Sequence, residues 1–174
     1  MESFALELFP NHGQVHMALF ENVTNASELK HRLINQDTAL TCALIDASFV
    51  IDRFHALLAT NRAVHEEQSQ KLKTYNLYSQ IIFNFSPNTN IAKSFQQFGI
   101  KENTTSVVAI KVGDSADEAE SFMKNCIKGN LVSLDQLSVI RDLKSIKKAY
   151  QIEEKEDVER VKSIVAGAMA LKGH

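Results

Sequence analysis

The stretch FALELFPNHGQVHMALF, residues 4–20, predicts how the fold begins. Every second residue from Phe4 to Leu8 is large and apolar, which is the period of a half-buried strand. Turn-forming residues follow at 10–13, and a second apolar run occupies 15–20. Two strands joined by so short a turn pair antiparallel, so we expect a β-hairpin at the start of the chain.

The same reasoning extends along the rest of the chain. Further strands are expected at 40–45, 79–86 and 105–112, and 79–86 has the strongest alternation. Helices are expected after the cap residue Asn25, over 50–68, over 91–98 before Gly99, after Ser115, at 133–136, over 142–150 and from Asp157 onward. About five strands interleaved with six or seven helices predict a single α+β domain over 1–174, with helices packed on a mixed or antiparallel sheet.

Composition excludes some classes of protein and points to one region. Of the 174 residues, 44% are hydrophobic and 23% are charged, which is typical of a globular chain. The formal net charge of −2 excludes a wholly basic nucleic-acid coat. Residues 50–112, however, contain seven Lys or Arg and four Asp or Glu, a net charge of +3. Because aromatic and amide side chains accompany these cations, the middle of the chain is where phosphate and base contacts are expected.

Motifs for catalysis are incomplete or missing. The run beginning at His65 resembles a zinc-protease helix, but Ser69 stands where the second histidine is required. Cys42 and Cys126 lie in apolar segments, where a lone cysteine is expected to be core. We therefore expect no catalytic residue, metal, cofactor, small-molecule substrate or membrane span. An enzyme would need a compact site in which the pKa of a Cys or His is shifted, and this alternative stays open.

Several segments occur in an order, along nearly the whole chain, that is known from one family. They are Leu19-Phe20, Val23-Thr-Asn-Ala26, Asn61-Arg-Ala-Val-His65, Lys71-Leu-Lys-Thr-Tyr-Asn-Leu77, the run from Ile81 to Ile91, Phe98-Gly-Ile100 and Ile146-Lys-Lys-Ala-Tyr150. With these segments the chain resembles the PRPK-binding protein family, the small accessory subunit of the KEOPS (EKC) complex.

The resemblance implies a non-enzymatic subunit of the complex that makes threonylcarbamoyladenosine in tRNA. It implies that the chain binds and regulates the complex's atypical kinase/ATPase (PRPK-type), reaches the transferase subunit through it, and helps to hold the tRNA acceptor CCA end. It further implies a cytoplasmic and nuclear location and a link to telomere maintenance.

We place the acceptor-end site on polar residues of the central region. These are Asn61, Arg62, His65, Lys71, Lys73, Tyr75, Ser86 and Asn88. Tyr75 stands where the family loop usually has Arg, so it would stack on a base rather than pair with a phosphate.

For the kinase contact we expect an apolar helical face, formed if the first and last helices adjoin. Its residues are Leu29, Leu33, Val161, Ile164, Val165 and Ala168. Small residues around Gly167 permit a close helix contact, either within the domain or with a partner. The alternative is a kinase-regulatory scaffold without RNA contact, suggested by the net charge of −2 and by Tyr75.

Overall fold

The computed structural model describes residues 1–173, and its centre is an antiparallel sheet. The first two strands, β1 (Glu2–Ala5) and β2 (Gln14–Glu21), form the expected hairpin. On its other side β2 pairs with β4 (Val107–Val112), and β3 (Ala43–Asp46) follows as the edge strand. A short strand, β5 (Asn130–Val132), pairs with the far end of β2. The sheet was predicted as mixed or antiparallel, and the structure confirms it as antiparallel.

The central strand β2 is apolar on both faces, and each face belongs to a different part of the core. Val15, Met17 and Leu19 pack in one cluster of buried side chains. Ala18 and Phe20 pack in the other. Because neither face of the strand is left for water, helices must cover the sheet on both sides.

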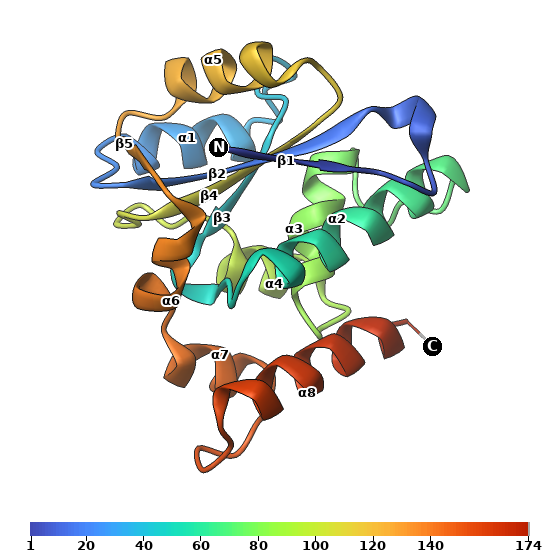
Figure 1. Ribbon diagram of the computed structural model, residues 1–174, viewed down its shortest axis with the longest axis vertical. Helices are drawn as coiled ribbons and strands as arrows, with labels where there is room; N and C mark the ends of the chain where they lie inside the picture. The colour runs from blue at the N-terminus through green and yellow to red at the C-terminus, as the bar shows by residue number, and fades with distance from the viewer. Residues whose placement is uncertain (174) are drawn as a thin grey trace.

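Eight α helices within residues 1–173 supply that cover (Figure 1). One face carries α1 (Ala26–Ile34) and α5 (Ala116–Cys126). The other face carries α2 (Arg53–Gln68), α3 (Leu77–Phe85) and α4 (Ile91–Phe98). The last part of the chain adds α6 (Leu137–Ile140), α7 (Leu143–Ala149) and α8 (Val158–Leu171). Figure 1 shows α8 beyond α2, on the side away from the sheet, so the molecule has a further helical layer there.

We expected a strand at 79–86, but residues 79–85 are helical and Ser86 is the C-cap, so that prediction was wrong. They belong to α3, whose first turn has a capping box: Asn76 accepts the N–H of Ser79 at 2.8 Å, and the Ser79 hydroxyl accepts the N–H of Asn76 at 3.1 Å. Nearly every side chain of α3 is buried. A segment without a polar face alternates by chance, so periodicity does not separate helix from strand there.

Gly99 ends α4 as expected, but for a different physical reason. Its φ is −70°, so no left-handed conformation is involved. A Cβ at this position would lie 2.6 Å from the carbonyl oxygen of Phe95, which leaves no room for a side chain. The Gly99 backbone also forms an isolated antiparallel bridge with Ile45 of β3. The glycine therefore allows the chain to leave α4 close to the carbonyl of Phe95, and its backbone then reaches the edge strand.

Asn25 precedes α1 as expected, but its side chain does not cap the helix. The side-chain amide donates to the carbonyl oxygen of Cys126 at 2.9 Å, and its oxygen accepts the N–H of Lys128 at 3.0 Å. Asn25 thus ties the beginning of α1 to the end of α5, a long-range role that local spacing does not reveal.

A buried histidine connects α2 with α3 and α7. His55 Nδ1 accepts the N–H of Ile51 at 3.1 Å, so the ring proton is on Nε2, which lies 3.1 Å from the Tyr150 hydroxyl. The Tyr150 hydroxyl donates in turn to the carbonyl oxygen of Phe85. Burial lowers the pKa of His55 to about 4, so the ring is neutral near pH 7.

We expect His55 to make the fold acid-sensitive. Its pKa is about 4 when folded against an ordinary value of 6.5, so between these values the unfolded chain binds the extra proton and acid favours unfolding. Between pH 7 and pH 5 this group should remove about 2 kcal/mol of the free energy of unfolding. His55→Gln keeps a donor and an acceptor but does not titrate. Its free energy of unfolding in urea should therefore fall less between pH 7 and pH 5 than that of wild type, by about 2 kcal/mol. Equal losses in the two proteins would contradict the assignment.

Candidate functional site

A polar loop, residues 71–76, connects α2 with α3, and one buried side chain holds its backbone. Gln80 Oε1 accepts the N–H of Lys73 at 3.0 Å and the N–H of Thr74 at 3.1 Å. With these donors turned inward, the side chains of Lys71, Lys73 and Tyr75 are exposed, Tyr75 by 51%. The loop therefore presents positive charge and an aromatic ring to solvent.

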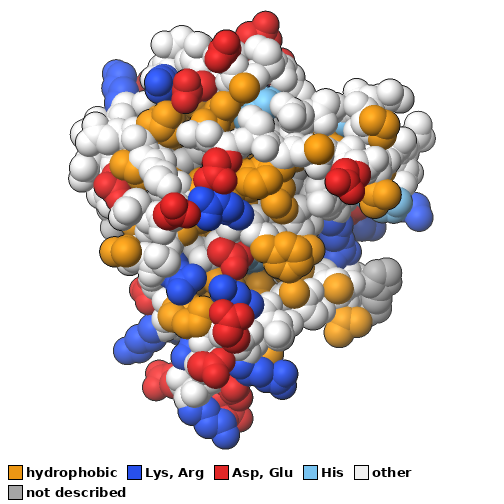
Figure 2. Space-filling view, in the orientation of Figure 1, with side chains coloured by type: hydrophobic (Ala, Val, Ile, Leu, Met, Phe, Trp, Pro, Cys, Tyr) orange, Lys and Arg blue, Asp and Glu red, His pale blue; other side chains and the backbone are white. Residues whose placement is uncertain are grey.

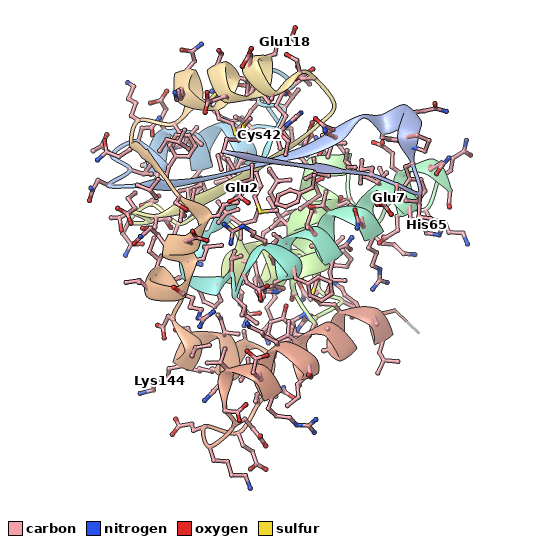
Figure 3. The ribbon with its side chains drawn as sticks, in the orientation of Figure 1. Glu2, Glu7, Cys42, His65, Glu118 and Lys144 are labelled. Carbon is pink, nitrogen blue, oxygen red and sulfur yellow. The ribbon has the colours of Figure 1, made fainter. Side chains whose placement is uncertain are left out.

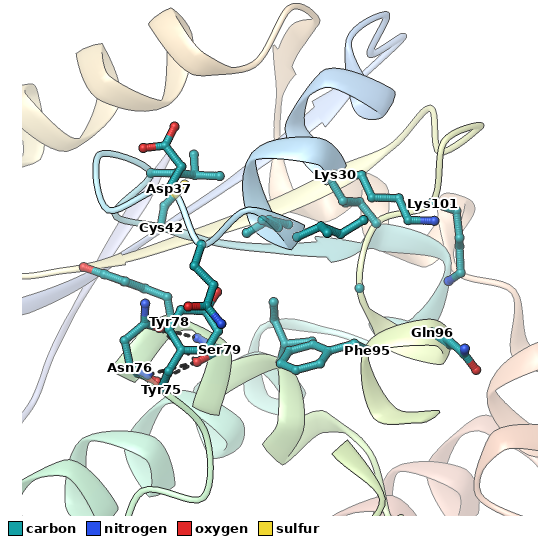
Figure 4. Close-up of a pocket in the computed structure, with 17 residues that line it drawn as sticks. Lys30, Asp37, Cys42, Tyr75, Asn76, Tyr78, Ser79, Phe95, Gln96 and Lys101 are labelled. Atoms are coloured by element: carbon teal, nitrogen blue, oxygen red, sulfur yellow. Dashed lines mark hydrogen bonds between the residues drawn. The ribbon is translucent and has the colours of Figure 1, made fainter. Parts of the chain in front are cut away.

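A cavity of about 510 Å³ opens beside this loop, between α1 on one face of the β3 edge and α3 and α4 on the other. Figure 4 shows the amino groups of Lys30 and Lys101 on one side of it and Tyr75 and Asn76 on the other. Its remaining walls are mostly apolar, with Leu33, Ile34, Leu40, Cys42, Ile82, Phe95 and Ile100 among them. A volume of this size suits a small molecule or a nucleobase with its sugar.

Some charged groups at the cavity are already paired. Lys101 Nζ lies 3.2 Å from the carboxylate of Asp46 and 4.4 Å from the centre of the Phe49 ring. Asp37 accepts a hydrogen bond from Arg32 at 2.7 Å, which lowers the pKa of Asp37. The carboxylate at the rim therefore stays ionised and neutralised by its own partner, and the cavity does not repel an anion strongly.

Cys42 lies in the wall of this cavity and is fully buried. Burial raises the pKa of its thiol to about 12, so the thiol stays protonated and is a poor nucleophile. The expectation that Cys42 is a core residue is confirmed. Cys126 is partly buried against the same hydrophobic cluster. Within the part of the chain that the structure describes, no group of three metal-ligating side chains occurs, and no helix is long and apolar enough to cross a membrane.

Arg62, expected at the acceptor-end site, has its guanidinium committed inside the chain. Its Nε donates to Glu66 at 3.0 Å. Its two terminal nitrogens donate to the backbone carbonyls of Met169 and Lys172, at the end of α8. These bonds use the planar donor fork that a phosphate would need. Arg62 thus anchors the end of α8, although its side chain is still 31% exposed.

The other expected acceptor-end residues do not form one cluster. His65 is exposed at the end of α2, where its ring centre lies 6.0 Å from that of Phe9, and Figure 3 shows it beside the β1–β2 connection. Asn61 is exposed earlier on α2. Ser86 is buried at the far end of α3, and its hydroxyl accepts the N–H of Asn88 at 3.0 Å. A nine-residue helix is about 13 Å long, so Ser86 and Asn88 lie well away from the 71–76 loop.

The structure does not bring the expected kinase-contact residues together. Leu29 and Leu33 of α1 pack in the cluster under α5, whereas the residues of α8 pack in the cluster on the opposite face of the sheet (Figure 1). The condition for this face, that the first and last helices adjoin, is therefore not met. Leu29, Val161 and Val165 are core residues, since at most 2% of each is exposed. The partly exposed members of the set are Leu33, Ile164 and Ala168.

Gly167 is exposed on α8, and no contact within residues 1–173 requires a glycine there. A Cβ added there meets no atom within 4 Å. Of the two explanations for the small residues on α8, close packing inside the domain does not apply to Gly167. Figure 2 shows hydrophobic side chains exposed on this side of the molecule, over α2 and α8, and Phe54 of α2 is 61% exposed.

Residues that sequence reasoning missed fall into two groups. Gln80 and Asn84 are polar residues four apart inside the apolar α3, and that contrast was a visible signal for a buried network. Lys30, Phe95 and Lys101 line the cavity from three separate segments, so no local pattern marks them.

The fold and this cavity define a class, an α+β protein with helices on both faces of an antiparallel sheet and a ligand-sized space at the edge strand. The family model described as "Kinase binding protein CGI-121" matches residues 20–173. The chain belongs to this family.

Curated relatives match over most of their length. A zebrafish (Danio rerio) protein named EKC/KEOPS complex subunit TPRKB is 39% identical over 153 residues, which cover 87% of this chain and 86% of that one. The EKC/KEOPS complex subunits cgi121 of Aspergillus terreus and Aspergillus fumigatus are 37% and 34% identical, over 91% and 99% of this chain and 91% and 97% of theirs. The resemblance drawn from the sequence is confirmed.

We expect the replacement of Arg62 by Ala to lower the stability of the fold much more than the replacement of Lys73 by Ala. Arg62→Ala leaves the largely buried Glu66 carboxylate without its cation and frees the end of α8, at a cost of about 2 kcal/mol. Lys73→Ala changes an exposed side chain and should stay within about 0.5 kcal/mol of wild type. Urea unfolding measures both values. An Arg62→Ala protein as stable as wild type would show that the anchor at α8 is not needed.

Proposed function

We propose that this chain is a non-catalytic accessory subunit of an EKC/KEOPS-type complex, working in the cytoplasm and nucleus. In this role it binds and regulates the atypical kinase/ATPase subunit, and through it the transferase, and it holds the single-stranded acceptor end of tRNA. Membership of a kinase-binding family and relatives named as subunits of this complex support the first part.

One observation carries the RNA part: the exposed 71–76 loop lies at the edge of the 510 Å³ cavity, and Tyr75 belongs to both. Lys71 and Lys73 supply positive charge for phosphates, and the Tyr75 ring supplies a face on which a base can stack. The apolar cavity beyond Tyr75 gives a terminal base a place out of water, with Lys30 on the opposite side. We therefore move the acceptor-end site from Arg62, Ser86 and Asn88 toward this loop and cavity.

For the kinase, we propose the outward face of α8. This helix forms the outermost layer of the fold, and Ile164 and Ala168 at its flank are partly exposed. Gly167 lies between them in sequence and leaves open space above the helix. A glycine inside an exposed helix lowers stability by about 1 kcal/mol relative to Ala, so a partner helix that approaches closely at Gly167 gives it a purpose.

The RNA site predicts a charge-dependent fall in affinity. Lys71→Glu with Lys73→Glu should weaken binding of a single strand ending in CCA and should lower the dependence of log affinity on log salt by about 0.7 for each phosphate that is no longer neutralised. Lys144→Glu with Lys148→Glu on α7 matches the charge change at another exposed place. Fluorescence anisotropy over a salt series measures both. The same salt slope in the loop variant and wild type would favour a kinase scaffold without RNA contact.

The kinase site predicts opposite effects of two changes at one residue. Gly167→Ala should stabilise the free chain by about 1 kcal/mol, because helix propensity improves and no internal atom is met. Gly167→Arg should keep a cooperative melt but abolish co-purification with the kinase subunit. Ile164→Arg tests the neighbouring flank, and Leu33→Arg on the opposite face of the sheet is the matched control. Kinase binding that survives Gly167→Arg and is abolished by Leu33→Arg would place the interface on α1.

A further inference from the structure

A largely buried carboxylate on α2 contacts α3 directly and is linked to α8 through Arg62. Glu66 of α2 has a side chain that is 15% exposed. Its Oε1 accepts hydrogen bonds from Arg62 at 3.0 Å and from Asn84 of α3 at 3.1 Å. Its Oε2 accepts the side-chain amide of Gln80, also on α3. Both carboxylate oxygens are therefore occupied by internal donors.

On one side this carboxylate controls the loop proposed for RNA. The amide nitrogen of Gln80 donates to Glu66, while the amide oxygen of the same side chain accepts the N–H groups of Lys73 and Thr74 at 3.0 and 3.1 Å. Gln80 is fully buried. A primary amide has a fixed geometry between its oxygen and nitrogen, so a shift of Glu66 changes where the loop donors find their acceptor.

On the other side the same carboxylate orients Arg62, which receives the end of α8. Arg62 donates to the carbonyls of Met169 and Lys172, the latter at 2.6 Å. The Lys172 ammonium turns inward, donates to the carbonyl of Phe83 and lies over the Phe83 ring. The end of α8 is thus held by α2 and α3 through directional polar contacts, and the contact of Lys172 with Phe83 is buried.

We infer that Glu66 and Gln80 couple the docking of α8 to the conformation of the 71–76 loop, so that the kinase on α8 and RNA at the loop strengthen each other's binding. The second half of this inference rests on the proposed function. A kinase packed on α8 favours the docked helix, which holds Arg62 and Glu66 in place and so fixes the Gln80 acceptor for the loop. Because such coupling is reciprocal, RNA bound to the ordered loop must favour kinase binding by the same factor.

The first test needs neither partner. Lys172→Ala removes one anchor of α8 without touching Glu66, Gln80 or the loop. If the coupling exists, hydrogen exchange of the Lys73 and Thr74 amides, followed by NMR, should speed up about fivefold or more, while amides of β2 keep their wild-type rates. Lys144→Ala, whose side chain points into solvent in Figure 3, is the control for the same truncation at an exposed place. Unchanged exchange at Lys73 and Thr74 in Lys172→Ala would overturn the inference.

The second test measures the coupling between partners. The kinase subunit should raise the affinity of the wild-type chain for a single strand ending in CCA by about fivefold or more. Gln80→Glu keeps an acceptor for the loop but places a carboxylate against Glu66, so this ratio should fall to about one. Adding Glu66→Gln moves the amide to the other side of the contact and should restore part of the ratio. Gln68→Glu changes an exposed residue of α2 and is the charge-matched control for Gln80→Glu.

The outcomes separate the inference from the proposed function. A wild-type chain that binds both partners with a ratio of one overturns the coupling and leaves the proposed function standing. A wild-type chain that binds the kinase but no RNA removes the RNA part of the proposed function, and the exchange experiment alone then decides whether α8 and the loop are linked.

Discussion

β2 buries Met17 on one face of the sheet and Phe20 on the other, so the chain must supply two separate helical layers. The two layers cover both faces of the sheet, and β3 lies at its edge, between α1 on one side and α3 and α4 on the other. On the free side of that edge strand, the backbone of Gly99 forms an isolated antiparallel bridge with Ile45. The cavity lies beside the edge strand, between the helices, so its position follows from the double-sided burial of a strand in the middle of the sheet.

The parts of the fold that were predictable are those in which a local pattern has one physical solution. The alternation and turn at residues 4–20 admit a hairpin, and Ser115 caps α5 by accepting the N–H of Glu118 at 3.2 Å, as the capping pattern predicts. α3 was not predictable in this way. It has apolar residues on all sides, so the pattern fits the two-residue period of a strand as well as the 3.6-residue period of a helix. The cavity was not predictable at all, since Lys30, Tyr75 and Phe95 become neighbours only when the two layers pack.

The candidate site shows a different limit, which concerns the role of a cation rather than its position. Arg62 and Lys73 look alike in the sequence, but Arg62 donates three hydrogen bonds inside the chain, whereas Lys73 is exposed. Arg62 and Glu66 are four apart on one helix, a spacing that suits an ion pair, whereas the carbonyls at the end of α8 lie more than 100 residues away in the chain. Local spacing can suggest a partner for a charge, but the tertiary fold determines whether that charge remains available.

Two local features of this chain depart from the local preferences of helices and of buried side chains. Glu66, Gln80 and Asn84 form a buried polar network where apolar side chains of similar size would often be at least as stable. Gly167 weakens an exposed helix although nothing nearby requires a glycine. Departures from local preference of this kind tend to gather at functional sites. Here the network lies beneath the loop proposed for RNA and Gly167 lies on the face proposed for the kinase. Arg62, which is bonded to Glu66, donates to the end of the helix that carries Gly167, so the two features belong to one connected part of the fold.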